Sequence, residues 1–368
     1  MEVEPKNPTF QVQASKSKTR RVWALALAFV VLLVALFRAS ALPLLPPREV
    51  LQTADWTWLG LSFAAFLLSA LAKYARIYFL VRPFADIGFG RCLRIGAIAA
   101  ALVTLLPFRL GEFARPALLR EKGKISGWHL TSTVAVERIL DGVAFGGVLL
   151  LGLWMAPPHE PLPDHIGKLP VPVHLVPAFA SWLTLCFGLL LAMMALAYLQ
   201  RGAIDFVLEK TLGRISRSLA ARAGKLVASL VEGVSFVRHG RLSVPYLGLT
   251  ALHIIAHVYA LEWLGFGVGL RELTFSEAST LVGCLAIGFA FPNAPGFFGA
   301  VQLSLYAGLG LYLLPADILV EGAALTSIFY FYFLITVLGL AVVMAIAEYG
   351  RKGMLLLFSI GSGELSRR

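Results

Sequence analysis

The chain has 368 residues, of which 58% are hydrophobic and only 14% are charged, and its mean hydropathy is +0.78. A soluble domain carries about 25% charged residues, so this composition excludes one, and continuous rather than alternating apolar runs exclude a β-barrel. The chain is therefore predicted to be an all-α polytopic membrane protein. Its formal net charge of +11 comes from cations clustered between the apolar runs. Such clusters indicate topology and contacts with anionic lipid, not nucleic acid.

The first apolar run, Val22–Phe37, follows a polar and basic segment, residues 1–21, that is expected to be a cytoplasmic tail. The sequence "RASALP" after this run leaves a cleaved signal peptide as an alternative, although the polar lead is long for one. A second run covers Trp58–Val81. Lys73 and Arg76 lie in its last turns, where their long side chains are expected to reach the membrane surface.

The next run, Ile95–Leu106, is too short to cross a bilayer and has arginines on both sides. A spanning helix would place one of these cationic sets outside, whereas a hairpin keeps both in the cytoplasm. The segment Arg94–Arg120 is therefore predicted to be a re-entrant helix pair, broken near Pro107–Gly111.

Two further spans are predicted at Leu130–Ala156 and Leu175–Leu199, joined by a proline-rich external loop that contains Glu160. The segment 201–241 is basic, and its apolar residues recur at helical spacing. This pattern predicts amphipathic helices on the cytoplasmic leaflet, with a helical linker packed on the bundle as the alternative.

The last third of the chain repeats the plan of the first. A span at Val244–Leu270 precedes two short runs, Ala278–Phe291 and Gln302–Leu314, which flank the sequence "PNAPGFFG". The flanks, which include Asp317, are poor in cations, so this hairpin is expected to enter from outside. The final span, Ala323–Ala347, returns to a cytoplasmic tail, residues 351–368.

Together these elements predict about six full spans and two re-entrant pairs in a single transmembrane domain, residues 22–350, with both termini cytoplasmic. The two breaks share the pattern Pro-x-x-x-Gly-x-Phe in "PFRLGEF" and "PNAPGFF", offset by 185 residues. Opposite orientations of residues 58–156 and 244–347 indicate an inverted repeat, as in many transporters. Coincidence is the alternative, because proline and glycine are common in membrane helices.

Charged residues at membrane depth usually face a partner or a water-filled cavity. Glu112 and Arg115 are expected on one face of a helix beginning at Gly111, whose N-terminus would favour an anion. In the following span, Arg138 and Asp141 have the spacing of an ion pair. These residues, with Arg109, could hold a phosphate, or Glu137 and Asp141 could belong to a structural network of salt bridges.

The sequence "HIIAH" places His253 and His257 on one face of a span, which makes them a weak candidate for a metal site. The pattern lacks a glutamate between the histidines, and the three cysteines are isolated, so neither a metal nor a cofactor is expected.

The stretches "LPFRLGEFARPALLR", "SGWHLTSTVAVERILDGVAF" and "FPNAPGFFGAVQLSL" resemble the transmembrane region of lysylphosphatidylglycerol synthase and its stand-alone, flippase-like relatives. The resemblance covers roughly Trp58 to Ala347 and implies lipid translocation in a bacterial inner membrane, without a lipid-synthase domain. Pro116, directly after Arg115, departs from the pattern and is expected to shorten or kink the exit helix. The candidate substrate-binding residues are Arg109, Gly111, Glu112, Arg115, Glu137, Arg138, Asp141, Asn293, Gly296 and Gln302.

The predicted function is therefore that of a flippase whose partners are membrane phospholipids, with anionic lipids favoured. The alternative is an enzyme acting on a lipid-linked substrate, with Glu137 or Asp141 as the general base. A partner of a separate lipid synthase or glycosyltransferase is a third possibility. The sequence leaves open the particular lipid, the direction, the energy source and the oligomeric state.

Overall fold

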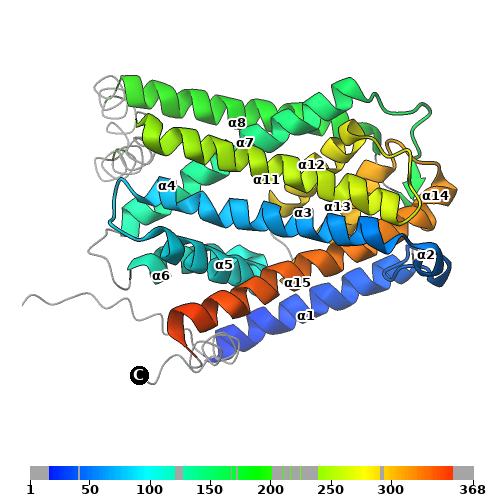
Figure 1. Ribbon diagram of the computed structural model, residues 1–368, viewed down its shortest axis with the longest axis horizontal. Helices are drawn as coiled ribbons and strands as arrows, with labels where there is room; N and C mark the ends of the chain where they lie inside the picture. The colour runs from blue at the N-terminus through cyan, green and yellow to red at the C-terminus, as the bar shows by residue number, and fades with distance from the viewer. Residues whose placement is uncertain are drawn as a thin grey trace, which may run out of the picture.

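Long helices follow the apolar runs of the chain in a computed structural model that describes residues 16–350, apart from 40–41, 121–126, 167, 171–172, most of 201–238 and 291–293 (Figure 1). The amphipathic segment expected at 201–241 therefore lies almost wholly outside the described residues. In chain order the elements are α1 (Lys16–Ala39), α2 (Arg48–Thr53), α3 (Trp56–Ala75), α4 (Ile77–Val81), α5 (Phe89–Leu105), η1 (Pro107–Phe113), α6 (Ala114–Arg120), α7 (Gly127–Met155), β1 (His165–Ile166), β2 (Leu169–Pro170), η2 (Val173–Leu175), α8 (Val176–Leu199), α11 (Gly240–Gly267), α12 (Phe275–Ala290), η4 (Pro295–Phe297), α13 (Ala300–Leu309), α14 (Pro315–Leu319) and α15 (Glu321–Tyr349).

Within the described residues, four stretches are long and apolar enough to cross a membrane: Trp56–Val81, Val173–Leu196, Gly240–Gly267 and Pro315–Tyr349. Two more helices, α1 and α7, have 24 and 29 residues and occupy the positions of the other two expected spans. The all-helical membrane class is thus confirmed, and the count of six spans stays a prediction. The small exception is an antiparallel pair, β1 and β2, in the loop between α7 and α8.

The first break in the helices lies where the sequence predicts it. Helix α5 ends at Leu105, the 3-10 helix η1 begins at Pro107, and α6 follows it. Arg109 has a left-handed backbone, with φ of 59°, which is rare outside glycine. Gly111 lies directly against the main chain of α5 at Leu102, so that η1 folds back onto α5. The result is a compact helix hairpin, α5–η1–α6.

The second break also combines left-handed backbone with close packing at a glycine. Helix α12 ends at Ala290, and the short η4 and then α13 follow. Gly296 and Gly299 have φ of 75° and 86°, which glycine adopts without steric cost. The hairpin arms pack closely, since Gly288 of α12 lies against Ser304 and the Ala300 carbonyl of α13.

The two hairpins lie in opposite halves of the bundle, among the long helices (Figure 1). The central pair is α3 with α11, which run antiparallel, because Ser62 donates to the Ala260 carbonyl and Ser69 bonds to His253. Helix α5 packs on α15, and α12 packs on α7. The largest apolar core lies among α3, α11, α12, α13 and α15.

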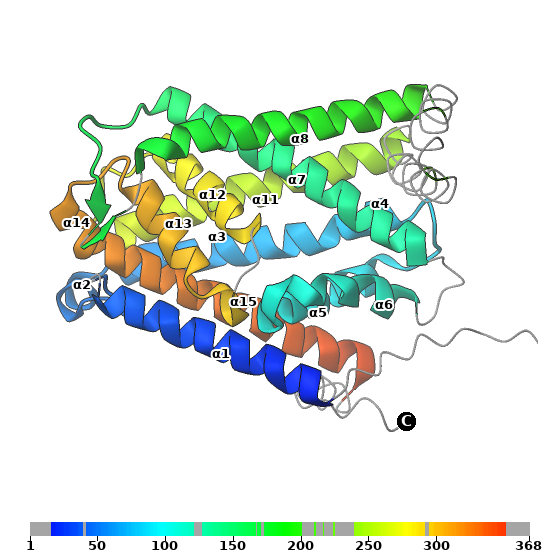
Figure 2. The same cartoon turned by 180° about the vertical axis from the view of Figure 1, so that it is seen from behind.

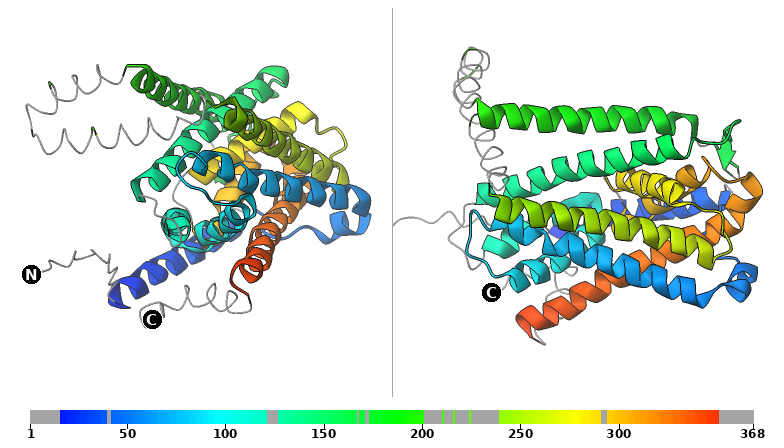
Figure 3. Two further views of the ribbon diagram at one scale, coloured as in Figure 1. Left: turned by 60° about the vertical axis from the view of Figure 1, so that its left-hand side comes forward. Right: turned by 45° about the horizontal axis from the view of Figure 1, so that its top comes forward.

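Two helices flank this arrangement. Helix α8 lies on the outer side of the bundle beside α7 (Figure 3), and most of its surface is exposed and apolar, as expected of a lipid-facing helix. Helix α1 runs along another face, next to α13 and α15 (Figure 2). It contacts η1, and its Leu33 and Phe37 pack against Gly299 and Phe298. Helix α1 thus covers both breaks.

Gly111→Ala is expected to destabilise the protein, because the added methyl group would overlap the α5 backbone at Leu102 and Val103. Overpacking of this kind costs about 1–3 kcal/mol. Thermal unfolding of detergent-solubilised protein measures the effect. Gly147→Ala is the matched control, because nothing lies within 4 Å of its added methyl group. Equal unfolding temperatures for the two variants would show that η1 does not need the close approach.

Candidate functional site

A buried network of four charged residues ties the first hairpin to α7 and to Arg76, which lies between α3 and α4. Arg76 is fully buried, and its Nη2 lies 3.2 Å from Oε1 of Glu137 and 2.6 and 2.7 Å from the two carboxylate oxygens of Asp141. Arg115 of α6 pairs with the other oxygen of Glu137. Glu137 therefore bridges two arginines at 0% exposure. This geometry favours the structural network over a free carboxylate for Glu137.

Arg76 corrects an expectation drawn from sequence. Its place in the last turns of the span predicted a side chain at the membrane surface, but the side chain points inward. It also donates from Nη1 to Thr250 of α11 at 3.2 Å and lies 5.5 Å from the ring centroid of Tyr246. The signal that could have found it is the unmatched acidic pair on α7, since buried carboxylates need cationic partners.

A second set of charges lies at the break itself. Arg109 binds Glu112 through Nε at 3.0 Å and through Nη2, and it donates from Nη1 to the carbonyl of Phe289. That carbonyl belongs to the last turn of α12, where carbonyls lack helical partners and attract cations. Arg138 approaches the same Glu112 at 3.6 Å. Arg109 thus joins the tip of the first hairpin to the second.

Two expectations about this region were wrong. A helix was expected to begin at Gly111, but α6 begins at Ala114, after the 3-10 segment, and has only seven residues up to Arg120. The short exit helix agrees with the expected effect of Pro116. The expected pair of Arg138 with Asp141 is replaced by Arg138 with Glu112 and Arg76 with Asp141.

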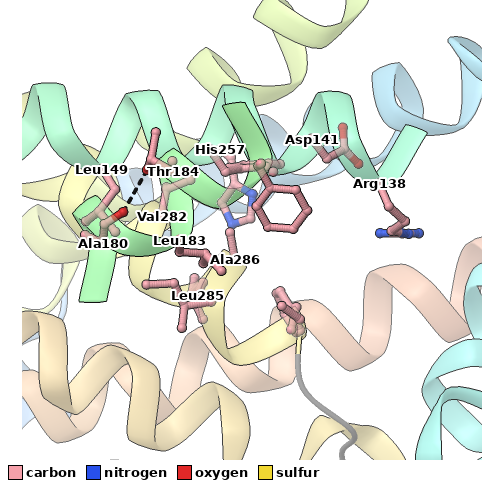
Figure 4. A pocket seen from close by; sticks show the side chains of 18 of the residues that line it. Arg138, Asp141, Leu149, Ala180, Leu183, Thr184, His257, Val282, Leu285 and Ala286 are labelled. Carbon is pink, nitrogen blue, oxygen red and sulfur yellow. Dashed lines mark hydrogen bonds between the residues drawn. The ribbon is translucent and has the colours of Figure 1, made fainter. Parts of the chain in front are cut away.

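These charges line one end of a cavity of about 400 Å³ between α7, α8, α11 and α12 (Figure 4). Arg138 and Asp141 lie at one end of the view, His257 lies near the middle, and Leu149, Ala180, Leu183 and Leu285 lie toward the other end. The charged part is completed by Lys73, Arg109 and Glu112. The cavity therefore has one charged and one apolar end, the chemical division of a lipid molecule.

A smaller cavity of about 110 Å³ shares Lys73, Arg109, Glu112 and Arg138 with the first. It continues toward Gly111 and Arg115 and reaches Phe297 of the second break. The two cavities therefore place the charged cluster where the two hairpins meet.

The structure brings most of the sequence-predicted residues together here. Arg109, Glu112, Arg138 and Asp141 line the larger cavity, Gly111 and Arg115 line the smaller one, and Glu137 lies behind them in the network. Of the residues predicted at the second break, Gly296 and Gln302 line neither cavity. Gln302 accepts a hydrogen bond from the Gly299 backbone at 2.8 Å and so caps α13, Gly296 lies near Tyr330, and Asn293 lies outside the described residues.

Lys73 was missed as a site residue, because its position near the end of a span predicted a surface side chain. It lines both cavities and, unlike the neighbouring arginines, makes no ion pair with any described residue. Among the described residues, the cluster then holds five cations (Lys73, Arg76, Arg109, Arg115, Arg138) and three carboxylates (Glu112, Glu137, Asp141). Its formal excess of two positive charges suits an anionic ligand.

The two histidines of α11 lie in the same cavity, with ring centroids 6.0 Å apart. The described residues contain no group of three or more metal-ligating side chains that could hold an ion. His253 is instead held by Ser69, through a contact of 2.7 Å to the hydroxyl and 3.0 Å to the carbonyl.

A helical bundle with two broken hairpins that meet at a partly charged cavity defines a polytopic membrane protein with an internal polar site. The family model described as "Lysylphosphatidylglycerol synthase TM region" matches residues 22–339, and the chain belongs to this family. The resemblance seen in the sequence motifs is therefore confirmed. Searches of the curated proteins and of the solved structures gave no match.

Proposed function

We propose that this protein moves a phospholipid, or another lipid with an anionic headgroup, between the two leaflets of the membrane. The observation that carries the proposal is the cavity whose charged end lies at the meeting point of the hairpins and whose apolar end lies between α7, α8 and α12. A charged headgroup can occupy the first part while an acyl chain stays in the second.

The charged cluster would lower the main barrier to lipid movement, which is the loss of water from the headgroup. A phosphate that enters hydrocarbon loses its hydration, at a cost of several kcal/mol or more. Charge-assisted hydrogen bonds from lysine and arginine replace part of that hydration. The excess of positive charge in the cluster offsets the charge of an incoming phosphate.

An inverted repeat of residues 58–156 and 244–347 gives the movement a mechanism. In this arrangement α3, α5 and α7 correspond to α11, α12 and α15. The packing supports it because it is reciprocal: α3 pairs with its counterpart α11, while α5 packs on α15 and α12 packs on α7. Rocking one repeat against the other would open the cavity alternately to each leaflet. The contact of Arg109 with the Phe289 carbonyl joins the two repeats at the centre.

The proposed orientation places both termini in the cytoplasm of a bacterial cell, in the inner membrane. The start of α1 and the end of α15 lie at the same end of the bundle, and α14 lies at the opposite end (Figure 1). The basic segment 201–241 has the composition expected on the cytoplasmic side.

Single cysteines at Glu160 and Asp317, in a background without the natural cysteines, are expected to react with a membrane-impermeant reagent from outside. A cysteine at Lys122 is expected to react only after the membrane is permeabilised. Labelling of Lys122→Cys in intact cells would contradict the re-entrant first hairpin, because that position would then lie on the outer side.

The enzyme alternative requires a carboxylate that can act as a general base. Glu137 binds two arginines and Asp141 binds Arg76, so the carboxylate oxygens are already engaged by guanidinium groups and are less free to accept a proton from a substrate. This pairing favours transport over catalysis. A role as partner of a separate lipid synthase or glycosyltransferase is compatible with transport, since such an enzyme would supply the lipid.

Reconstituted liposomes test the proposal. Vesicles that contain the protein are expected to move fluorescent anionic phospholipid from the inner to the outer leaflet faster than protein-free vesicles, as measured by dithionite quenching. Equal rates with several anionic lipids, with and without a proton gradient, would overturn the proposal.

A further inference from the structure

The neutral, polar middle of the cavity is formed by His253 and His257 of α11. They are 4% and 7% exposed. Both ring nitrogens of His257 and Nε2 of His253 are buried without a hydrogen-bond partner among the described residues. Buried polar groups without partners are rare and costly, so these three nitrogens mark a place where a ligand can bind.

The tautomer of His253 follows from its partner. Nδ1 lies 3.0 Å from the backbone carbonyl of Ser69, and a carbonyl oxygen can only accept. The proton is therefore assigned to Nδ1, while the Ser69 hydroxyl donates to the His253 carbonyl at 3.0 Å. The free Nε2 is left with a lone pair, so this end of His253 accepts a hydrogen bond and does not donate one.

His257 offers both a hydrogen-bond donor and an acceptor. Its ring is held between Phe66 and Phe329, at centroid distances of 5.2 and 5.7 Å. No carboxylate pairs with it among the described residues, and in these apolar surroundings the neutral imidazole is favoured. A neutral imidazole has one N–H donor and one lone pair. With His253, the pair therefore presents two acceptors and one donor.

The order of residues along α3 and α11 places this polar pair next to Lys73. The two helices run antiparallel, with Arg76 beside Thr250 and Ser69 beside His253. Lys73 lies one helical turn before Arg76 and one after Ser69, and a turn rises about 5.4 Å. His257 lies one further turn along α11. Lys73, which has no ion-pair partner in the described part of the chain, is thus followed along the cavity by the two histidines. The apolar part of the cavity lies beyond them.

We infer that Lys73, His253 and His257 form a subsite for a phosphate ester that carries a free hydroxyl a few bonds from the phosphorus. Lys73 binds the phosphate. The hydroxyl donates to a histidine lone pair and accepts from the His257 N–H, a combination that an ester carbonyl or a quaternary amine cannot provide. The inference rests on the proposed lipid function and assigns the chemistry of the lipid. The hydroxyl can belong to a polyol headgroup or to the glycerol backbone of a lysolipid.

Three lipid probes of the same single negative charge test the inference in native mass spectrometry of the purified, full-length protein. Phosphatidylglycerol has headgroup hydroxyls, lysophosphatidylethanol has only a backbone hydroxyl, and phosphatidylethanol has none. Retention of one hydroxyl-bearing probe about five- to tenfold above phosphatidylethanol is expected, the size of one lost buried hydrogen bond. The preferred probe identifies the source of the hydroxyl. Equal retention of all three probes by the wild-type protein would overturn the inference.

His257→Phe keeps an aromatic ring and removes both nitrogens. The retention of the preferred hydroxyl-bearing probe relative to phosphatidylethanol is therefore expected to fall close to one. Lys73→Met should weaken retention of every probe by a similar factor. His174→Phe, an exposed position in η2, is the matched control and should keep the wild-type preference. An unchanged preference in a folded His257→Phe would overturn the inference. Because binding is read separately from lipid movement, a preference without transport would contradict only the proposed function.

Discussion

Glu137→Ala is expected to lower the free energy of unfolding by about 3–5 kcal/mol, the effect of removing one partner from a buried ion pair. The carboxylate lies at 0% exposure between Arg76 and Arg115, so its removal leaves two buried guanidinium groups with fewer acceptors. The substitution also removes the ion pair that links α6 of the first hairpin to α7. Loss of folded protein from the membrane is therefore expected to precede any loss of transport.

Size-exclusion profiles and thermal unfolding in detergent measure this effect. Glu160→Ala, an exposed position in the loop after α7, is the matched control and should leave the unfolding temperature unchanged. A second variant replaces Arg115 and Glu137 together by Met and Leu. It is expected to recover part of the lost stability, because Arg115 no longer lacks its partner and the pair of Arg76 with Asp141 stays in place. A wild-type unfolding temperature for Glu137→Ala would show that the network does not hold the hairpin in place.

Arg109→Ala is expected to slow lipid movement at least tenfold while the protein still folds. Arg109 lines both cavities and is partly exposed to them, so its removal takes away a headgroup ligand. It also removes the bond to the Phe289 carbonyl that joins the hairpins. One lost charge-assisted hydrogen bond of about 1.5–3 kcal/mol corresponds to a ten- to hundredfold change in rate.

The liposome assay with fluorescent anionic lipid measures this rate. Lys168→Ala lies in the exposed loop between β1 and β2 and removes one cation far from the cavities, so it should keep the wild-type rate. A slow rate in both variants would point to a general effect of charge. A wild-type rate for a folded Arg109→Ala would remove Arg109 from the pathway.

The breaks in the helices could be predicted from sequence because their causes are local. A proline at Pro107 and glycines at Gly296 and Gly299 restrict or free the backbone whatever surrounds them. The start of α6 was misplaced by three residues because η1 is a 3-10 helix held by the packing of Gly111 on α5, which is a long-range contact. Local sequence carries little information about such contacts.

The partners of the buried charges could not be predicted for the same reason. Arg76 and Asp141 are 65 residues apart, and Arg109 meets a carbonyl 180 residues away. Sequence spacing favoured the neighbours Arg138 and Asp141, yet Arg138 pairs with Glu112 on the hairpin. Lys73 and the histidines were assigned no joint role, because only the antiparallel packing of α3 on α11 brings them into one cavity.

Helix α1 has a consequence for how the chain tolerates truncation. Hydrocarbon offers no hydrogen bonds, so irregular backbone is stable at membrane depth only where protein or water covers it. Helix α1 contacts η1 and places Leu33 and Phe37 against the turn at Phe298 and Gly299. Helix α1 therefore shields both kinked segments from the acyl chains of the lipid. A chain that began at α2 would keep the residues that line the cavity but would lose this cover. Lipid tails would then reach main-chain amides that have no hydrogen-bond partner in hydrocarbon.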